Sequence, residues 1–430
     1  MKIFKYPEQE KWASILSRPV IDRRALFETV QKILNKVHKD GDQAIKEYTA
    51  LFDKVSLDTL EVTKEEINEA EKLVPKELKE AIEMARRNIW KFHSAQQTVF
   101  KEIQTSPGVN CWQKALPIEK VGLYIPGGTA PLFSTVLMLG IPAKIAECKE
   151  IILCSPPTSN GKIHPSILYA AKMAGIHRIF KIGGVQAIAA MAYGTETVPK
   201  VYKIFGPGNQ YVTAAKQLVS MEGVAIDMPA GPSEVAIIAD ESANPVFVAA
   251  DLLSQAEHSV DSQCVLITTS EKLIQPVLEE IERQKKQLLR KDIIQQSLEN
   301  TRIILVKSIE NAINMINEYA PEHLIIATRF PQEVSLNIVN AGSVFLGNYA
   351  PESAGDYASG TNHTLPTNGY AKSYNGVNLD SFLRKITFQY LTRDGLVNLS
   401  NAIILMAENE GLDAHSNAVK VRLDENNLNF

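Results

Sequence analysis

The chain has 430 residues, of which 45% are hydrophobic and 22% charged, so it has the composition of an ordinary globular protein and is too long for a single compact core. Its net charge is -4 and it contains no block of Lys and Arg, which argues against a nucleic-acid partner. No apolar run approaches the ~18 residues of a membrane-spanning helix and the first residues lack the apolar core of a signal peptide, so we expect a cytoplasmic protein with no membrane partner.

Residues 1–118 are predicted to be mostly helical. We expect a short helical extension before residue 24, a long amphipathic helix with a break at 39–42, a capping box of Thr63 and Glu66 that begins another helix, and a further helix over 75–92. His38 and His93 lie on charged faces of these helices, so we interpret them as solvated side chains. This part of the chain is interpreted as scaffold.

From residue 121 the pattern changes to short apolar segments that alternate with helical ones. A first block is predicted to have strands at 121–125, 151–154, 178–182, 201–204 and 224–227, with helices at 134–148, 165–174, 185–193 and 211–221. A second block is predicted to have strands at 235–238, 265–267, 303–306, 324–327 and 344–347. Such alternation predicts parallel sheets with helices on both faces. Two successive blocks suggest a duplicated architecture, although no sequence repeat relates them.

Three glycine-rich turns follow strands of the first block, at 124–131, 182–186 and 205–210. Glycine permits close backbone approach, and the helix behind each turn directs free N–H groups at a ligand, so phosphate groups fit there. None of the turns matches G-x-G-x-x-G followed by an acidic residue about 20 positions later, and an ordinary tight turn is an equal alternative for each alone. Three such turns on one edge of a sheet favour a nucleotide or another phosphate ligand.

Metal-ligand side chains gather in four separate stretches. Gln255 and His258 stand three residues apart at the end of a predicted helix, and so lie on one face of it. Alone, this pair is more simply a polar helix end. Possible partners are Glu322 with His323, the Gly/Ser-rich loop at 351–363, and residues 410–415. Together the four stretches supply a metal site with a spare carboxylate and imidazole.

The last segment continues neither predicted sheet. Residues 379–391 and 399–407 are predicted to be helices, so we expect residues 378–430 to form a small helical arm. Arms of this kind often pack on another subunit, and His415 near its end is therefore a candidate for a neighbouring subunit's site.

With these motifs in order, the chain resembles the histidinol dehydrogenases over essentially its whole length. The motifs that carry the resemblance are GLYIPGG at 122–128, KIFGPGN at 203–209, AGPSE at 230–234, LSQAEH at 253–258, PEHL at 321–324, GDYASGTNH at 355–363 and EGLDAH at 410–415. The resemblance implies a zinc enzyme that oxidises L-histidinol to L-histidine through L-histidinal with two NAD+, the final step of histidine biosynthesis.

The resemblance also implies roles for particular residues. It implies one zinc ion per subunit, with the ligands Gln255, His258, Asp356 and His415, which also contact the substrate. Ligand chemistry alone would instead rank His363 above Gln255. The further substrate contacts that it implies are Ser233, Glu322, His323, His363 and Glu410. The implied NAD contacts are Tyr124, Gln186 and Asn209, one on each of the three glycine turns.

Taken with the resemblance, the pattern predicts an α/β protein with two Rossmann-like parallel-sheet domains. We expect an N-terminal helical extension at 1–23, a main α/β domain at 24–123 and 235–377 that carries most of the metal and catalytic site, an NAD-binding α/β domain at 124–234, and a C-terminal helical arm at 378–430. The resemblance implies a homodimer in which His415 is contributed across the interface.

The chemistry follows from these residue types. Zinc has no redox chemistry, so hydride must leave to a nicotinamide while the metal holds the imidazole and amine of the substrate. His323, as a neutral imidazole, is expected to remove the alcohol proton, and Glu322 to activate the water that adds to the aldehyde. Both side chains must enter one pocket, which the alternating faces of a strand forbid, so residues 321–323 are predicted to be non-strand.

Three alternatives remain. The four cysteines contain no C-x-x-C pair and are interpreted as reduced thiols, but Cys154 could carry a thiohemiacetal, although no neighbouring residue would lower its pKa. A zinc hydrolase, with Glu322 activating metal-bound water, explains the ligands but gives the glycine turns no role. A non-enzymatic nucleotide-binding regulator leaves the ligand cluster without a purpose. Formation of NADH discriminates against the last two.

Overall fold

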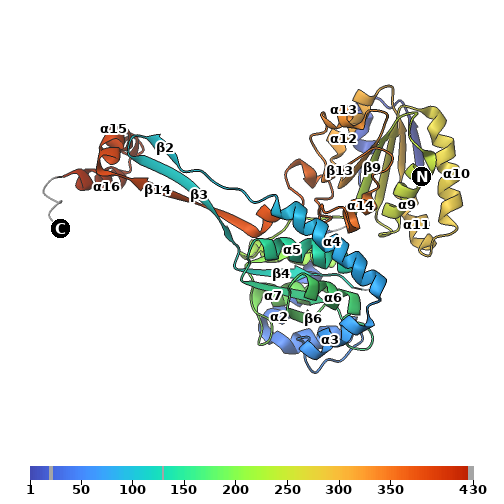
Figure 1. Cartoon of the computed structure of the whole chain (residues 1–430), viewed down its shortest axis with the longest axis horizontal. Coiled ribbons are helices and arrows are strands. Elements are labelled where there is room, and N and C mark those ends of the chain that lie inside the picture. The colour runs from blue at the N-terminus through green and yellow to red at the C-terminus, as the bar shows by residue number, and fades with distance from the viewer. Residues whose placement is uncertain (19–22, 128–129, 425–430) are drawn as a thin grey trace. The chain divides into compact units, whose positions relative to one another are not determined.

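The computed structural model describes residues 1–18, 23–127 and 130–424. They form two compact units, which Figure 1 draws in one view. The first unit comprises Met1–Gln96 and Ile118–Phe382, and the second comprises Gln97–Pro117 with the described residues from Leu383 onward. Gly128 of the first glycine turn and residues 19–22 of the predicted extension lie outside the described residues.

The first unit contains a six-stranded parallel sheet with the strand order β1-β11-β10-β9-β12-β13. Its strands are β1 (Lys2–Lys5), β9 (Glu234–Ala239), β10 (Gln263–Thr268), β11 (Arg302–Leu305), β12 (His323–Ala327) and β13 (Ser343–Leu346). Val235 and Ile237 share a core with α9 (Pro245–Ala256) and α10 (Glu271–Lys285), whereas Ala236 shares one with α12 (Ile309–Tyr319). Both faces of β9 are therefore buried, which explains its continuous apolar sequence.

The first unit also contains a five-stranded parallel sheet with the order β6-β5-β4-β7-β8. Its strands are β4 (Lys120–Tyr124), β5 (Glu150–Ser155), β6 (Arg178–Lys181), β7 (Lys203–Phe205) and β8 (Ala225–Ile226). In chain order this sheet reads 3-2-1-4-5, and β9 to β13 repeat that order in the other sheet, where β1 adds one edge strand. The expected α/β architecture with parallel sheets is confirmed.

Helices cover both faces of the five-stranded sheet (Figure 1). One face shares a core with α2 (Arg23–Phe52), α7 (Gly184–Tyr193) and α8 (Gln210–Met221). The helices α3 (Lys64–Leu73), α4 (Lys76–Ser94), α5 (Phe133–Ile145) and α6 (Pro165–Met173) pack together as a second group. Gly41, with φ of 54°, kinks α2 at the expected break, and the capping box of Thr63 and Glu66 is present.

Three expectations for the N-terminal part are corrected by this packing. Lys2–Lys5 form a strand rather than a helix, because they pair with β11 at the sheet edge. The helices of residues 23–94 pack with the five-stranded sheet, so they do not group with residues 235–377 as expected. His93 is buried rather than solvated, with Nδ1 3.2 Å from Gln96 Oε1, and burial lowers its pKa.

The remaining short helices of the first unit are α1 (Trp12–Ile15), α11 (Lys291–Ser297), α13 (Pro331–Ser335) and α14 (Glu352–Tyr357). Trp12 and Ile15 of α1 pack in the core beside α12. The segment α14 is only six residues long, yet it carries two carboxylates of the site described below.

The second unit is a three-stranded antiparallel sheet followed by two helices. Its elements are β2 (Ile103–Ser106), β3 (Val109–Pro117), β14 (Leu383–Leu391), α15 (Arg393–Asn409) and α16 (Asp413–Leu423). The helix expected over residues 379–391 is therefore wrong, and the end of the part expected to be mostly helical, up to residue 118, forms the strands β2 and β3. Trp112 and Phe388 lie opposite each other on β3 and β14 and stack with ring centroids 5.5 Å apart, a cross-strand pair that stabilises the sheet.

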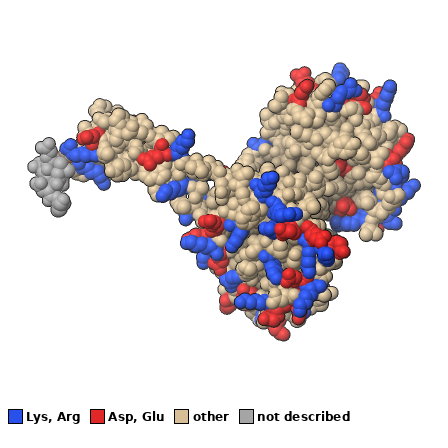
Figure 2. Space-filling model, viewed as in Figure 1, with Lys and Arg blue, Asp and Glu red and all other residues tan. Residues whose placement is uncertain are grey.

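The surface carries both signs of charge. Figure 2 shows Lys and Arg interspersed with Asp and Glu over the face in view. Among the described residues, no helix combines the length and the apolar composition needed to cross a membrane.

The turn after β7 is held by a buried ion pair between Lys216 and Asp227. Lys216 Nζ donates to the carbonyl of Gly206 at 2.9 Å, and Asp227 Oδ2 accepts from the N–H of Gly206 at 2.8 Å. Gly206 has φ of 128°, and a Cβ added there would lie 2.0 Å from the carbonyl oxygen of Tyr124. Glycine at this position therefore lets the turn approach the end of β4.

We predict that Gly206→Ala destabilises the protein by about 2–5 kcal/mol, because it combines backbone strain with a backbone clash. Gly223→Ala is the matched control, since Gly223 has φ of 93° but no atom within 4 Å of an added Cβ. It should cost only about 1–2 kcal/mol. Denaturant unfolding of the three proteins measures both values, and equal losses in the two variants would contradict the close approach of the turn to β4.

Candidate active site

The backbone of Glu234 holds the two candidate catalytic side chains. Glu322, directly before β12, accepts a hydrogen bond at Oε2 from the N–H of Glu234 at 2.8 Å. His323 Nδ1 lies 3.1 Å from the carbonyl oxygen of Glu234. Because a carbonyl only accepts, Nδ1 carries the proton in this contact and Nε2 is left to act on other groups.

Glu322 and His323 are both buried, with 6% and 5% of their surfaces exposed, and both side chains reach the same site. Residues 321–323 were all expected to be non-strand. This expectation is wrong for His323, which is the first residue of β12. The strand begins between the two residues, so its alternation of faces does not separate them. The pair lies at the amino ends of β9 and β12, whereas open α/β sheets usually bind ligands at the carboxyl ends.

Glu234 is itself fixed by its side chain. Its carboxylate accepts two hydrogen bonds from the Arg18 guanidinium, at 2.5 and 2.9 Å, and one from the N–H of Asn368 at 2.8 Å. The guanidinium also lies 4.0 Å from the ring centroid of Tyr319. A bidentate pair of this kind is rigid, so it restrains the backbone that positions Glu322 and His323.

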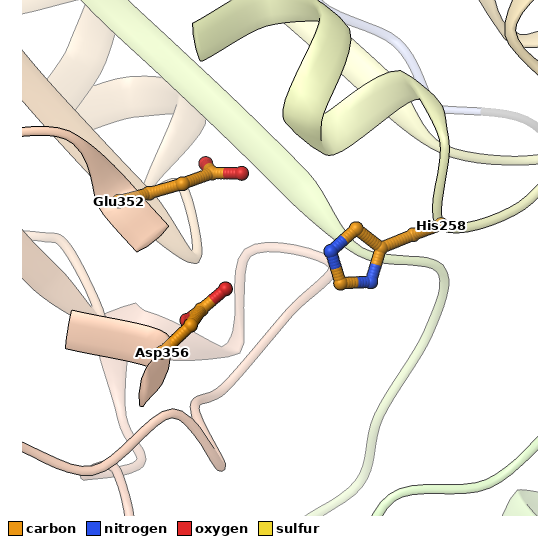
Figure 3. A group of neighbouring side chains, drawn as sticks. All are labelled: His258, Glu352 and Asp356. Carbon is orange, nitrogen blue, oxygen red and sulfur yellow. The ribbon is translucent and has the colours of Figure 1, made fainter. Parts of the chain in front are cut away.

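Three metal-ligand side chains meet beside His323. The ligand atoms of His258, Glu352 and Asp356 all lie within 4.8 Å of one another. Figure 3 shows the two carboxylates side by side, facing the imidazole of His258 on the loop after α9. Glu352 and Asp356 stand four residues apart in α14 and therefore share a face of it. His323 Nε2 lies 3.4 Å from Asp356 Oδ1, so the catalytic pair adjoins this group.

Two buried side chains, Glu352 of the group and Gln255 three residues before His258, carry polar atoms without hydrogen-bond partners among the described residues. Gln255, in the last turn of α9, is buried, and neither Oε1 nor Nε2 has a hydrogen-bond partner among the described residues. Glu352 Oε2 has none either, although Ser254 donates to its Oε1 at 2.9 Å. Buried polar atoms without partners are costly, and a cation held by carboxylate, imidazole and amide atoms would satisfy them. These residues fit a divalent metal.

His363 joins the site from the Gly/Ser-rich loop. Its Nδ1 lies 2.9 Å from the carbonyl oxygen of Asp356 and its Nε2 lies 3.0 Å from Thr135 Oγ1. Both ring nitrogens are therefore engaged, which fits a position beside the ligands rather than among them. Ser233 directly precedes Glu234 at the start of β9.

The remaining expected residues of the site belong to the second unit. Glu410 caps the C-terminal end of α15 and His415 lies in the first turn of α16, and both are exposed. The first unit thus brings together Gln255, His258, Glu322, His323, Asp356 and His363.

The five-stranded sheet carries a cavity of about 840 Å³ at the carboxyl ends of its strands. Tyr124, Gln186 and Asn209, one from each glycine turn, all line it. Tyr124 Oη accepts a hydrogen bond from the N–H of Gly184 at 3.1 Å, and Asn209 caps α8 by accepting from Tyr211 and Val212. The three glycine-rich turns predicted from the sequence therefore line the same cavity.

Burial and charge shift the pKa values of the site. Burial raises the pKa of Glu322 to about 7 and that of Glu352 to about 8. Burial by itself lowers the pKa of His323. The carboxylates of Glu322 and Asp356 raise this pKa by more than burial lowers it, so its value is about 10. The expected neutral imidazole of His323 is thus not the favoured form while these carboxylates lack a cation.

Glu352 is a candidate ligand for which no role was predicted from the sequence. It lies in the segment 351–363, which was expected to be a Gly/Ser-rich loop. The four-residue spacing of Glu352 and Asp356 was the signal, because two carboxylates at this spacing share a face if the segment is helical. The glycine and serine content of the segment favoured an irregular loop instead.

Comparisons with known proteins cover both units. The family model described as histidinol dehydrogenase matches residues 16–423. Histidinol dehydrogenase of Bacteroides fragilis is 66% identical over 425 residues, and that of Bacteroides thetaiotaomicron is 66% identical over 424, each covering 99% of both chains. The crystal structure of histidinol dehydrogenase from Elizabethkingia anophelis is similar with a TM-score of 0.96 and 55% identity, covering 98% of each chain.

The pKa of Glu352 generates a prediction for the protein treated with chelator. Its carboxyl group has an ordinary pKa of 4.5 and a folded pKa of about 8, so between these values the folded chain binds a proton that the unfolded chain has released. This contribution to stability is present at low pH and is lost as pH rises through about 8. We predict that Glu352→Gln raises the midpoint of thermal unfolding by roughly 2–5 °C at pH 8.5 and by less at pH 6.

The same variant should bind a divalent metal such as zinc more weakly, because it loses one carboxylate of the group that could hold a metal ion. Calorimetric scans at the two pH values and a competition titration with a zinc chelator measure both effects. A difference in melting temperature that is the same at pH 6 and pH 8.5 would contradict the role of the buried carboxylate.

Proposed function

The chain belongs to the histidinol dehydrogenase family, and on that premise we propose that it oxidises L-histidinol to L-histidine through L-histidinal, with zinc and two NAD+. It is accordingly an oxidoreductase of histidine biosynthesis. One observation best supports the proposed roles of zinc and His323. His323 Nε2 lies 3.4 Å from Asp356, whose carboxylate belongs to the group of ligand atoms from His258, Glu352 and Asp356.

The proposed zinc ligands of the first unit are Gln255, His258 and Asp356, with Glu352 as an additional candidate. The buried, unpaired side-chain atoms of Gln255 and Glu352 support this set. We retain His415 as the fourth ligand. When bound, Zn2+ would hold the imidazole and amine of the substrate, and its positive charge would lower the pKa of His323 toward the neutral form.

The cavity at Tyr124, Gln186 and Asn209 is the proposed NAD site. Its place agrees with the rule that open parallel sheets bind nucleotides outside the carboxyl ends of their strands, where the strand order reverses between β4 and β7. The N-termini of α7 and α8 lie at these turns, and their positive partial charge favours phosphate groups, while the N–H groups of Gly184, Tyr211 and Val212 already donate to side chains of the turns. NAD+, when bound, accepts the two electrons released in each oxidation.

The proposed proton transfers use the residues beside Glu234. His323 takes the proton of the substrate hydroxyl at Nε2, since Nδ1 is held by the Glu234 carbonyl. Glu322 then takes a proton from the water that adds to the aldehyde, and its pKa of about 7 suits a group that must both bind and release a proton near neutral pH. His323 Nδ1 and Glu322 Oε2 are 3.7 Å apart, so both act on one small volume.

The alternatives fit these observations less well. Cys154 is fully buried at the end of β5 and burial raises its pKa, which disfavours a thiolate that could form a thiohemiacetal. A zinc hydrolase would use Glu322 but would give the cavity at the glycine turns no role. A regulator that only binds nucleotide would leave the catalytic pair unexplained.

Two further parts of the proposal concern architecture. The shared strand order 3-2-1-4-5 of the two sheets supports a duplicated, Rossmann-like origin. Exposed apolar side chains of the second unit, such as Leu405, Met406 and Val421, support a homodimer in which His415 serves the partner. Sedimentation analysis that gave the mass of a single chain would contradict this homodimer.

We predict that the purified protein forms about two NADH per L-histidinol consumed. Activity should be lost when the metal is chelated and regained when zinc is added. Absorbance at the NADH band, scored against substrate consumed, measures the ratio. One NADH with release of free aldehyde would contradict the hydration step assigned to Glu322, and no NADH in any metal state would favour the hydrolase.

We predict that Glu322→Gln separates the two oxidations. With L-histidinal and NAD+ its rate should fall by about 10²–10⁴-fold, because hydration loses its base. The reverse reduction of L-histidinal by NADH needs no hydration and should fall by less than about tenfold. His323→Gln, the matched variant, should slow both reactions, and equal losses in the two reactions of Glu322→Gln would show that Glu322 is not specific to the hydration step.

A further inference from the structure

Asp53 places a carboxylate in the cavity of the five-stranded sheet. It directly follows α2, and its backbone N–H donates to the carbonyl of Thr49 at 2.9 Å, which fixes the turn. Its side chain lines the cavity together with Tyr124 and Gln186. The Oδ2 atom is buried and has no hydrogen-bond partner among the described residues. An unpaired buried carboxylate oxygen is costly unless a ligand supplies a donor.

The other polar groups of the cavity do not satisfy Asp53. Gln186 Oε1 is also buried without a partner in the described part of the chain, so it is a second acceptor that needs a donor. None of the described residues that line the cavity is Lys or Arg. The cavity therefore suits a ligand with hydroxyl or amide donors at this place and disfavours an additional phosphate.

We propose that Asp53 accepts a hydrogen bond from the 2′-hydroxyl of the adenosine ribose and thereby selects NAD+ over NADP+. This inference rests on the proposed function, because it assumes that the cavity holds a nicotinamide dinucleotide. A carboxylate recognises a ribose hydroxyl as an acceptor and repels a 2′-phosphate by charge, whereas sites for NADP+ provide a cation there.

The layers of the fold indicate which ribose reaches Asp53. The active site contacts this part of the molecule through α5, where Thr135 meets His363 and the carbonyl of Met138 accepts from Asn362 at 2.6 Å. The nicotinamide must approach the substrate, so it belongs on the α5 side. Asp53 follows α2, which packs with α7 on the other face of β4 (Figure 1). The adenosine end of an extended dinucleotide is therefore the end that lies beside Asp53.

Asp53 is ionised under assay conditions. Burial raises its pKa to about 6, so the carboxylate form predominates at pH 8 and above. A hydrogen bond to a charged group contributes more binding free energy than one between neutral groups. Loss of the ribose 2′-hydroxyl is therefore expected to lower kcat/KM by about 10- to 100-fold.

The test compares three nucleotides as substrates with L-histidinol in the zinc-loaded protein. They are NAD+, NADP+ and 2′-deoxy-NAD+, which here means NAD+ that lacks the 2′-hydroxyl of the adenosine ribose. The variant is Asp53→Asn, which keeps the size of the side chain. The control is Asp58→Asn, an exposed carboxylate five residues away that does not line the cavity. The value of kcat/KM is measured for each nucleotide, and kcat at saturating nucleotide shows whether the chemical steps are intact.

The wild-type chain should prefer NAD+ to 2′-deoxy-NAD+ by about 10- to 100-fold in kcat/KM, and Asp53→Asn should reduce this preference to about threefold or less. The ratio of kcat/KM for NADP+ to that for NAD+ should rise at least about tenfold in Asp53→Asn, while Asp58→Asn should behave as the wild type. These results would support the inference.

Equal use of NAD+ and 2′-deoxy-NAD+ by the wild-type chain would overturn the inference without any need for a folded variant. So would a preference that Asp53→Asn leaves unchanged. A wild-type chain that forms no NADH from NAD+ and L-histidinol is a separate outcome, which would overturn the proposed function and this inference with it.

Discussion

The hydrogen bonds between the Glu234 backbone and the side chains of Glu322 and His323 are the interactions on which the site depends. They form because β9 and β12 are adjacent parallel strands in a fixed register, with His323 opposite Val235. A shift by one residue would turn His323 to the other face of the sheet. The bidentate contact of Arg18 with the Glu234 carboxylate adds a restraint from the N-terminal segment. The side chains of Glu322 and His323, the proposed proton acceptors, are thus positioned mainly by backbone groups.

Much of the first unit could be predicted because its signals are local. Strands such as 235–238 are short apolar runs between helical segments, and the capping box of Thr63 and Glu66 marks a helix start within four residues. The strand Leu383–Leu391 was mistaken for a helix because its apolar residues fit a helical spacing as well as an alternating one. Only its pairing with β3 decides between them, and that pairing is long-range. The packing of α2 against α7 could not be predicted from local sequence patterns either, because the two helices are far apart in the chain.

The site could be predicted as a set of residues but not as an arrangement. His258 stood out by ligand type, Gln255 and Asp356 were assigned as ligands by the family resemblance, and the turns of Tyr124 and Asn209 stood out by their glycines. No sequence pattern shows that Glu352 joins the ligand group or that Asp53 enters the cavity, since both facts depend on where helix ends meet after folding. The raised pKa of His323 in the metal-free chain could not be predicted from the sequence for a related reason. Its pKa reflects carboxylates that folding gathers from separate segments.

The two sheets share a strand order, yet their functional groups lie at opposite edges. At the carboxyl ends of β4 and β7 the backbone leads into helix N-termini, which present positive partial charge. At the amino ends of β9 and β12 the N–H of Glu234 donates to the Glu322 carboxylate. The same strand order therefore places a cavity beside helix N-termini in one sheet and a pair of side chains held by backbone groups in the other. Under the proposed function, the five-stranded sheet would hold the electron carrier and the six-stranded sheet the proton acceptors, so one strand order would serve two chemical tasks according to which edge of the sheet is used.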